Sequence, residues 1–517
     1  MPGRMEFQFE LPRSDSRPHR RDPDTPLRVL VMADFSGRAR RENPSALLEL
    51  SSRPLLTANA DNLDAVMARL APKLRLTLNG GAGGAALTIG FAQLDDFHPD
   101  ALYQRLELFQ SLRRSRARLL NPASFAQAVA ELSPTPLQES VKPEPAAAED
   151  DAALLERLLG KTSEPPSTRP ATSEPPSTRP AVDVGTATIN TLLQAVVQPH
   201  IVRTDPRQEA WIEAVDAAIG EQLRAILHQP AFQALEATWR GVRDLVANLD
   251  SDLLRVDLLD VTKQELLADL RTAAGQPRAT SLYTLLIDRE VQLPDSQPWS
   301  LLVGDYAFGA TPDDIALLAA LGSVAAHAGG PFLAAADPSA LGCASAAELA
   351  DPTQWASLPA AAEQHWQALR QTEVAPWLGL ALPRVLLRLP YGQKTEPVEQ
   401  MEFEEMPLGR DPDAYLWGNP AFACARLIAA AFAENGWDFS LGDVLELDDL
   451  PAHVYEEAEE RRMQPGTEVL LGERAMQALL ARGIMPLLGH RQRNVVRLAR
   501  FQSLADPPAA LAGGWRG

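Results

Sequence analysis

A perfect tandem repeat sets the organisation of this chain. The same ten residues, Thr-Ser-Glu-Pro-Pro-Ser-Thr-Arg-Pro-Ala, occupy positions 162–171 and again 172–181. The tract has no apolar side chain larger than those of Ala and Pro, so it cannot bury a hydrophobic core. Its prolines favour extended polyproline II backbone, which makes a semi-rigid spacer. We therefore predict a disordered linker over 135–182 between two folded blocks, 1–134 and 183–517.

The composition is that of a globular protein with more than one domain. The chain has 517 residues, 45% hydrophobic and 22% charged, and this length exceeds what one core supports. A net charge of −20 argues against nucleic acid and anionic membrane as partners. The two cysteines give no metal-ligand spacing and no disulfide framework. With no signal-peptide core and no apolar span, we expect a soluble protein of a reducing cytoplasm.

The first block is predicted to be a small α/β domain. Apolar periodicity defines its helices, and short apolar or alternating runs define its strands. In chain order we expect a strand at 27–33, a helix at 61–70, strands at 73–78 and 86–91, and a helix of about five turns from Pro99. The glycine-rich stretch 80–84 formally fits a dinucleotide pattern, but it joins two strands, so a hairpin loop is the better interpretation.

A separate strand is predicted ahead of this block. Residues 5–11 alternate apolar and polar without a fault, and Met5, Phe7, Phe9 and Leu11 share the apolar face. A spacer over 12–25 follows. A lone strand is not stable, so it must join a sheet. That sheet belongs either to the same domain or to another subunit, and the sequence favours neither.

The linker contains one island of predicted order. Residues 152–160 form a two-turn helix whose single apolar face carries Leu154, Leu155, Leu158 and Leu159. So short a helix is marginal when isolated. Its apolar face suggests docking, either into a groove of a partner or onto a neighbouring domain of the same chain. Its assignment to the first or the second block stays open.

The second block is predicted to be a larger α/β domain. Its motifs are a capping box from Thr262 to Glu265 and a helix that Thr311 caps and Gly329 ends. In chain order we expect helices at 212–226 and from Pro230, a strand at 253–259, a helix after Thr262, a strand at 300–304, a helix at 312–327 and a strand at 331–336. The strand-helix-strand order at 300–336 predicts a parallel pair with a right-handed crossover.

No motif points to catalysis, a cofactor or a metal. Gly160-Lys161-Thr162 resembles the end of a phosphate loop, but position 155 is Leu instead of Gly and prolines follow. The sequence has no Gly-x-Ser-x-Gly and no His-Glu-x-x-His, and its histidines form no i, i+4 pair. We therefore expect a protein that is not an enzyme.

Six runs of the second block stand in a specific order. They are 230–241 (PAFQALEATWRG), 302–306 (LVGDY), 382–392 (LPRVLLRLPYG), 415–420 (YLWGNP), 465–468 (PGTE) and 483–487 (GIMPL). Together they resemble the large contractile-sheath subunit of type VI secretion systems, the TssC (VipB) family, over roughly 184–505.

Three runs of the first block point the same way. They are 30–38 (LVMADFSGR), 61–67 (DNLDAVM) and 94–102 (LDDFHPDAL). They resemble the small sheath subunit, the TssB (VipA) family, over about 5–132. The chain is thus identified as a fusion of two subunits that are usually separate chains.

The resemblance implies a structural role. In this family the two subunits pair into protomers that stack around a tube of Hcp rings, and contraction of the sheath drives the tube outward from a baseplate. The AAA+ ATPase ClpV then disassembles the sheath through a short helix near the start of the large subunit, which 152–160 resembles by position. Strands exchanged between neighbours hold the protomers together, which fits residues 5–11.

One departure from the family leaves two alternatives open. The large subunit of the family normally continues beyond the point that matches residue 505, and that region supplies strands of the exchanged sheet. The expected protein is therefore either an ordinary sheath protomer or an accessory that docks on a sheath or baseplate and ends a row. A third alternative is an adaptor that binds ClpV through 152–160.

Overall fold

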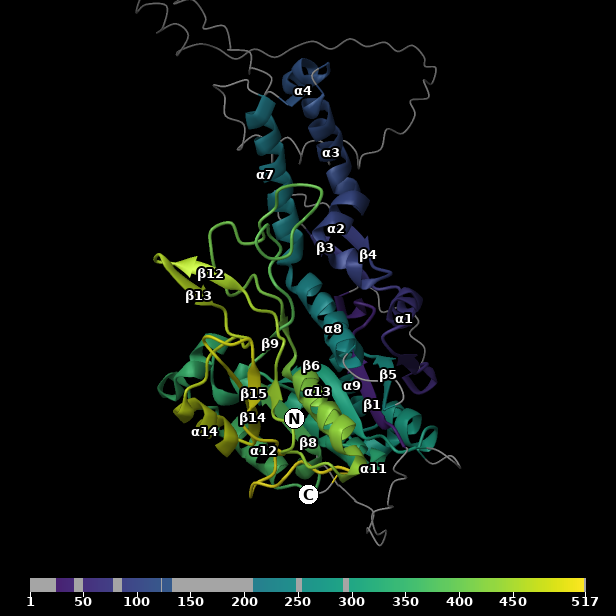
Figure 1. The fold of residues 1–517 in the computed structure, drawn as a ribbon. Helices are drawn as coiled ribbons and strands as arrows, with labels where there is room; N and C mark the ends of the chain where they lie inside the picture. Colours follow the sequence, from purple (N-terminus) through teal and green to yellow (C-terminus); the bar gives the residue numbers. More distant parts are fainter. Residues whose placement is uncertain are drawn as a thin grey trace, which may run out of the picture. The chain divides into compact units, whose positions relative to one another are not determined.

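The computed structural model describes residues 25–40, 50–77, 86–121, 123–132, 208–247, 253–291 and 297–515 (Figure 1). The strand at 5–11, most of the spacer 12–25 and the linker with its helix at 152–160 lie outside these ranges and stay predictions. The chain divides into two compact units. One holds the residues up to Leu106 and those from Gly220 onward, and the other is Glu107–Ile219.

The first unit is built on a nine-stranded mixed sheet. Its strands, in spatial order, are β11 (Glu446–Leu447), β15 (Val496–Leu498), β14 (Ile484–Gly489), β8 (Leu378–Leu382), β7 (Phe332–Ala336), β6 (Leu301–Phe308), β1 (Leu27–Ala33), β5 (Leu254–Asp260) and β2 (Leu56–Ala58). From β14 to β5 all neighbours are parallel, and β2, β15 and β11 are antiparallel additions at the two edges. The predicted α/β class is confirmed.

Strand β1 occupies the predicted residues and lies inside this sheet. It pairs in parallel with β5 on one side and with β6 on the other, and all seven of its residues are buried. Six of its seven residues are apolar, as expected for a strand covered on both faces, and the exception, Arg28, is buried in an ion pair. The two predicted blocks therefore share one sheet, and the compact units do not follow the boundaries predicted from the linker.

Helices cover both faces of the sheet (Figure 1). Those that matter below are α8 (Pro230–Ala247), α9 (Lys263–Thr272), α11 (Pro312–Ala328), α12 (Ala360–Arg370), α13 (Pro420–Asn435) and α14 (Glu473–Ala481). Both α11 and α13 pack on β6, β7 and β8. Among the described residues, no helix is long and apolar enough to span a membrane.

Local signals in the sequence placed several element ends correctly. Thr262 and Glu265 form the predicted capping box at the start of α9. The Thr311 side chain accepts a hydrogen bond from Asp314 N at the start of α11, and Gly329 ends that helix with a φ of 89°. The parallel pairing of β6 with β7 across α11 is confirmed as well.

Two short ribbons accompany the sheet. β3 (Lys73–Thr77) and β4 (Ala86–Gly90) pair antiparallel, as predicted for a hairpin around the glycine-rich stretch, after helix α1 (Leu63–Leu70). A second hairpin, β12 (Val454–Glu457) with β13 (Glu460–Met463), carries mostly exposed charged side chains. The sequence analysis did not identify this second hairpin.

The long helix predicted from Pro99 is wrong in one respect, because the structure has two helices there. They are α2 (Pro99–Arg105) and α3 (Glu107–Leu120). Leu106 between them has extended backbone angles, φ −78° and ψ 130°, and its side chain is buried. Tertiary packing of Leu106 overrides the helical periodicity of the sequence. The break coincides with the boundary between the two compact units.

Candidate functional site

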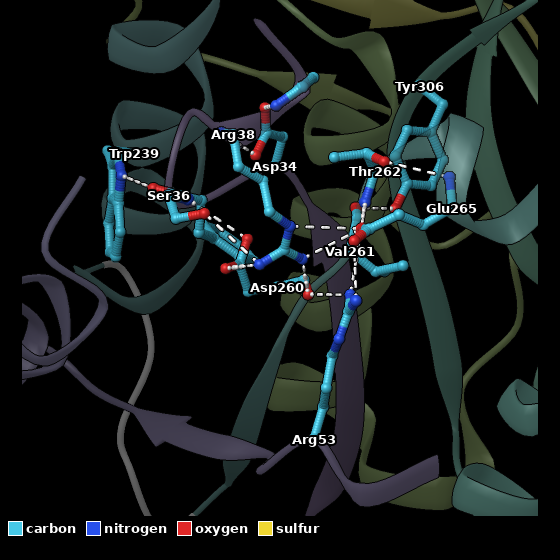
Figure 2. Close-up of polar contacts among 12 residues, drawn as sticks. Asp34, Ser36, Arg38, Arg53, Trp239, Asp260, Val261, Thr262, Glu265 and Tyr306 are labelled. Atoms are coloured by element: carbon cyan, nitrogen blue, oxygen red, sulfur yellow. Dashed lines mark hydrogen bonds and ion pairs between the residues drawn. The ribbon is translucent and has the colours of Figure 1, made fainter. Parts of the chain in front are cut away.

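The contact between the two blocks, which we call the joint, contains a network of charged side chains contributed by both blocks. It lies where β1 and β5 end side by side, and the Ala33 carbonyl accepts a hydrogen bond from Val261 N at 2.8 Å. Four charged side chains make up its centre (Figure 2): Arg38 and Arg53 from the first block, and Asp260 and Glu265 from the second.

Arg38 reaches across the joint with its whole guanidinium. Its Nη1 lies 2.5 Å from Asp260 Oδ2, and its Nε and Nη2 lie 3.3 and 3.1 Å from Glu265 Oε2. Nη2 also donates to the Asp260 carbonyl. The turn at 34–38 positions this side chain, because the Asp34 carboxylate accepts hydrogen bonds from Arg38 N and Ala39 N, both at 2.9 Å.

Arg53 approaches the same carboxylate from the segment that leads into β2. Its Nη2 lies 2.7 Å from Glu265 Oε1, and its Nη1 lies 3.0 Å from both Glu265 Oε2 and the Asp260 carbonyl. The Arg53 side chain is only 8% exposed. A two-pronged arginine–carboxylate contact of this kind fixes geometry as well as charge.

The pKa values of Glu265 and Asp260 are shifted in opposite directions. Burial alone would raise the pKa of the Glu265 carboxyl, but hydrogen bonds from Arg53 and Thr262 N and the charge of Arg38 outweigh it and lower the pKa to about 2. For Asp260 burial dominates and raises the pKa, because Arg38 compensates only in part. Glu265 therefore stays ionised and accepts hydrogen bonds from both arginines of the first block.

Aromatic side chains of the second block complete the joint. Trp239 Nε1 donates to the Phe35 carbonyl at 3.1 Å, and the two rings lie 5.2 Å apart. The Tyr306 hydroxyl donates to the Val261 carbonyl at 2.7 Å (Figure 2). Trp239 is fully buried and Tyr306 nearly so. Both donors therefore satisfy backbone carbonyls at the ends of β1 and β5 that would otherwise be costly to bury.

A second ion pair joins the blocks at the other end of the sheet. The Arg28 guanidinium on β1 lies 3.2 Å from Asp257 on β5 and 2.7 Å from Glu290, and it stacks 3.7 Å from the centre of the Trp299 ring. Thr57 on β2 donates to Asp257 at 2.6 Å. Charged contacts therefore secure β1 at both of its ends.

The hairpin and α2 of the first block also pack on the second. Phe91 and Phe97 stack at 4.2 Å, and both meet the ring of Phe232 on α8 edge-on, at 5.8 and 5.4 Å. Asp100 at the start of α2 accepts hydrogen bonds from Glu399 N and Gln400 N at 2.9 and 3.0 Å. The joint thus continues from the sheet into an aromatic contact.

A cavity of about 450 Å³ lies beside the joint, at the carboxyl ends of β1, β5 and β6. Its polar wall includes Asp305, whose pKa burial raises and whose carboxylate accepts a hydrogen bond from the Thr238 hydroxyl at 2.5 Å. Its remaining wall is rich in alanine. In the described ranges, no group of three or more His, Cys, Asp or Glu side chains could hold a metal ion.

The candidate residues predicted from the sequence are not part of this site. Met5, Phe7, Phe9, Leu11 and the four leucines of 152–160 all lie outside the described residues. Arg38, Arg53 and Asp260 were not singled out as interacting partners. The available signal was the set of polar residues Asp34, Ser36 and Arg38 directly after a mostly apolar strand, since polar groups at the carboxyl end of a parallel strand often form sites.

Two protein-family models match the chain. The model for VipB, described as "EvpB/VC_A0108, tail sheath N-terminal domain", matches residues 209–505. The model "Type VI secretion system, VipA, VC_A0107 or Hcp2" matches residues 4–146. The first match takes in more than half of the chain, and the two matches stand in the order that the sequence resemblance predicts.

Two curated relatives from Pseudomonas aeruginosa PAO1 agree with these matches. "Type VI secretion system sheath protein TssC1" is 34% identical over 329 residues, which cover 62% of this chain and 66% of the relative. "Type VI secretion system sheath protein TssB1" is 29% identical over 103 residues, which cover 19% of this chain and 58% of the relative. The chain thus spans somewhat less than two thirds of each relative's length.

Proposed function

Because the chain belongs to the VipB tail sheath family and carries a VipA-type segment ahead of it, we propose that it is a structural component of a type VI secretion contractile sheath. One polypeptide supplies the small and the large subunit of a protomer. The protomers assemble with copies of themselves or with other sheath subunits around an Hcp tube on a baseplate. The assembly is cytoplasmic and docked at the inner membrane, and it carries no catalytic activity.

The observation that supports this proposal best is the position of β1. A strand of the small-subunit block lies between two strands of the large-subunit block, with ion pairs at both ends. Within this compact unit the two blocks share one sheet, so we expect them to move together when force is applied. That property suits a mechanical part that stores work in contacts between subunits.

Electron microscopy of the purified full chain tests assembly. We expect tubes or rings. The double variant Phe7→Asp with Phe9→Asp should keep the melting temperature of the wild type but lose the tubes, because it destroys the apolar face of the strand that we propose to be exchanged at 5–11. Monodisperse wild-type monomers would instead favour the accessory that ends a row.

We also propose that Leu154, Leu155, Leu158 and Leu159 form the recognition helix for the ATPase ClpV. Four leucines on one face of a short helix are the anchors that a groove of a partner recognises. The double variant Leu155→Asp with Leu158→Asp should abolish binding of the ATPase to the assembled protein in a pull-down. Unchanged binding would refute the assignment of this helix.

A further inference from the structure

A hairpin of the larger compact unit has little packing of its own. It consists of β12, β13 and the turn between them, residues 454–463, which we call the arm. Neither strand contains a buried residue, and Figure 1 shows the arm extending away from the sheet of its unit. A two-stranded hairpin without a packed face is only marginally stable in water. The arm therefore covers no core, and its side chains are available to a partner.

The contacts that hold the arm lie at its root. Gln464 N donates to the His453 carbonyl at 2.8 Å, directly below the paired strands. The Tyr415 hydroxyl lies 2.6 Å from Nδ1 of the same histidine, and the Arg410 guanidinium lies 5.8 Å from the centre of the Tyr455 ring. Each strand has four residues that rise by roughly 3.3 Å each, so the tip stands about 13 Å beyond this root.

The tip presents a carboxylate from a strained turn. Ala458 and Glu459 have φ angles of 52° and 66°. Glycine and asparagine are the residues that hairpin turns with this left-handed backbone prefer. Strained residues of other types occur most often where a function depends on them. The conformation of the tip therefore points to a role for the Glu459 carboxylate.

The arm is acidic, and its excess charge lies at the tip. Its charged side chains are those of Glu456, Glu457, Glu459, Glu460, Arg461 and Arg462. Arg462 lies 2.5 Å from Glu457 and 3.3 Å from Glu460. Arg461 lies 4.0 Å from Glu456. Glu459 forms no ion pair with another described residue, so its charge is not compensated within the chain.

The same unit carries a basic loop between β14 and β15. From Ile484 to Ala505 the sequence has four arginines and no acidic residue, although the whole chain has a net charge of −20. Arg491 and Arg493, in the loop after β14, are exposed, and neither forms an ion pair with another described residue. We call these two arginines the basic loop. Two uncompensated guanidinium groups one residue apart attract a carboxylate.

Within one chain the basic loop lies near the root of the arm. Asn494, next to Arg493, accepts a hydrogen bond from Leu450 N at 3.3 Å and donates one from Nδ2 to the Leu450 carbonyl at 3.2 Å. Leu450 comes three residues before His453 at the root. The uncompensated negative and positive charges thus lie toward opposite ends of the arm, and no ion pair joins them among the described residues of one chain.

We propose that the tip of the arm of one copy of this chain contacts the basic loop of a second copy. There the Glu459 carboxylate accepts hydrogen bonds from Arg491 and Arg493. The inference rests on the proposed assembly of copies, because it names one contact between them. Two copies with a net charge of −20 repel each other overall, so a local contact between opposite charges decides which surfaces meet.

Disulfide trapping between two full-length chains tests the contact while every charge is kept. One chain carries Ala458→Cys at the tip, and the other carries Gln492→Cys between the two arginines. The native Cys343 and Cys424 are buried, so the introduced cysteines react alone. We expect a mixed disulfide to form roughly tenfold faster under mild oxidation than in the control mixture, in which the second chain carries Gln477→Cys.

The control is matched in chemistry and exposure. Gln477 is an exposed glutamine on α14 of the same compact unit, and Gln492 is exposed as well. A faster reaction of the tip with position 492, at a rate that rises with protein concentration, supports the proposal. Equal rates for the two mixtures would overturn it.

Charge reversal tests the chemistry of the contact. Adding Glu459→Arg to the tip chain, or Arg491→Glu with Arg493→Glu to the loop chain, should slow trapping to the rate of the control mixture. Mixing the two reversed chains should restore the fast rate, because the charges are again opposite. All three positions are exposed, so the melting temperatures should not change. A rate that is insensitive to these reversals, or that stays slow in the doubly reversed mixture, would contradict the contact.

Electron microscopy of the same samples separates this inference from the proposed function. Tubes together with equal trapping rates would refute the contact and leave the sheath function standing. Fast trapping without tubes would support the contact and count against the sheath function. Chains that neither trap faster than the control nor form tubes would refute both.

Discussion

The joint and helix α4 (Phe125–Leu132) differ in how much of their apolar surface is buried. In the joint, all seven residues of β1 are buried. Arg28 within β1 and Arg38 after it form ion pairs with carboxylates of the other block. On α4, Ala128 is the one buried residue among six apolar ones, and Leu120 at the end of α3 is half exposed. The difference teaches where the fold depends most on burial: β1 is a permanent part of the core, whereas α4 is only partly buried.

Breaking β1 should have the largest effect. Val31→Asp places a carboxylate without a partner between β5 and β6, where Val31 is fully buried, and should cost more than about 4 kcal/mol and prevent soluble expression. Ala126→Asp on α4, where the side chain is exposed, is the control and should remain soluble with a melting temperature close to that of the wild type. Equal losses for both variants would remove the distinction between the two regions.

Removing one partner of the central ion pair should have the next largest effect. Arg53→Ala leaves Glu265 with a single arginine in a largely buried site, and we expect a loss of about 3 kcal/mol in urea unfolding. Arg461→Ala in the β12–β13 hairpin, where the side chain is 83% exposed, should change stability by less than about 0.5 kcal/mol. If Arg53→Ala lost as little stability as the control, the ion pairs of the joint would contribute no more than exposed surface pairs do.

Acid should weaken the joint in a defined direction. The pKa of Glu265 is lowered from an ordinary 4.5 to about 2, so its contribution to stability is complete above pH 4.5 and is lost as the pH falls toward 2. Glu265→Gln removes this contribution at every pH. The difference in unfolding free energy between wild type and variant should therefore be constant from pH 7 to 5 and shrink below pH 4.5. A difference that grows on acidification would contradict the assignment.

The smallest effect should come from the exposed end of helix α3. Leu120→Ser removes a side chain that is already half exposed, and we expect a change in unfolding free energy of less than about 1 kcal/mol. Leu119→Ser, one residue earlier and fully buried, should cost several times more. Calorimetric unfolding of the two variants measures the difference in stability contributed by a buried and a half-exposed leucine of the same helix.

Local chemistry in the sequence was sufficient for single elements. The mostly apolar run at 27–33 predicted β1 at its observed bounds, and the Thr262 to Glu265 spacing predicted the start of α9. These signals depend on residues that are close in sequence, so periodicity and capping rules capture them.

Such local rules do not predict which strands and side chains pair when they are distant in sequence. Nothing in the local pattern of 27–33 indicates that it lies between strands more than 220 residues later. Glu265 was read as a capping residue, and its second role as the acceptor of Arg53 depends on a contact over 212 residues. The break at Leu106 was missed for the same reason, since the burial of that side chain is decided by tertiary packing.

Cleavage of the linker tests most directly that the joint, and not the covalent tether, holds the two blocks together. A protease site placed between residues 171 and 172, inside the tandem repeat, divides the full chain after it has folded. We predict that the two fragments coelute as a one-to-one complex in size-exclusion chromatography and separate only in denaturant. Fragments that separate under native conditions would contradict the account.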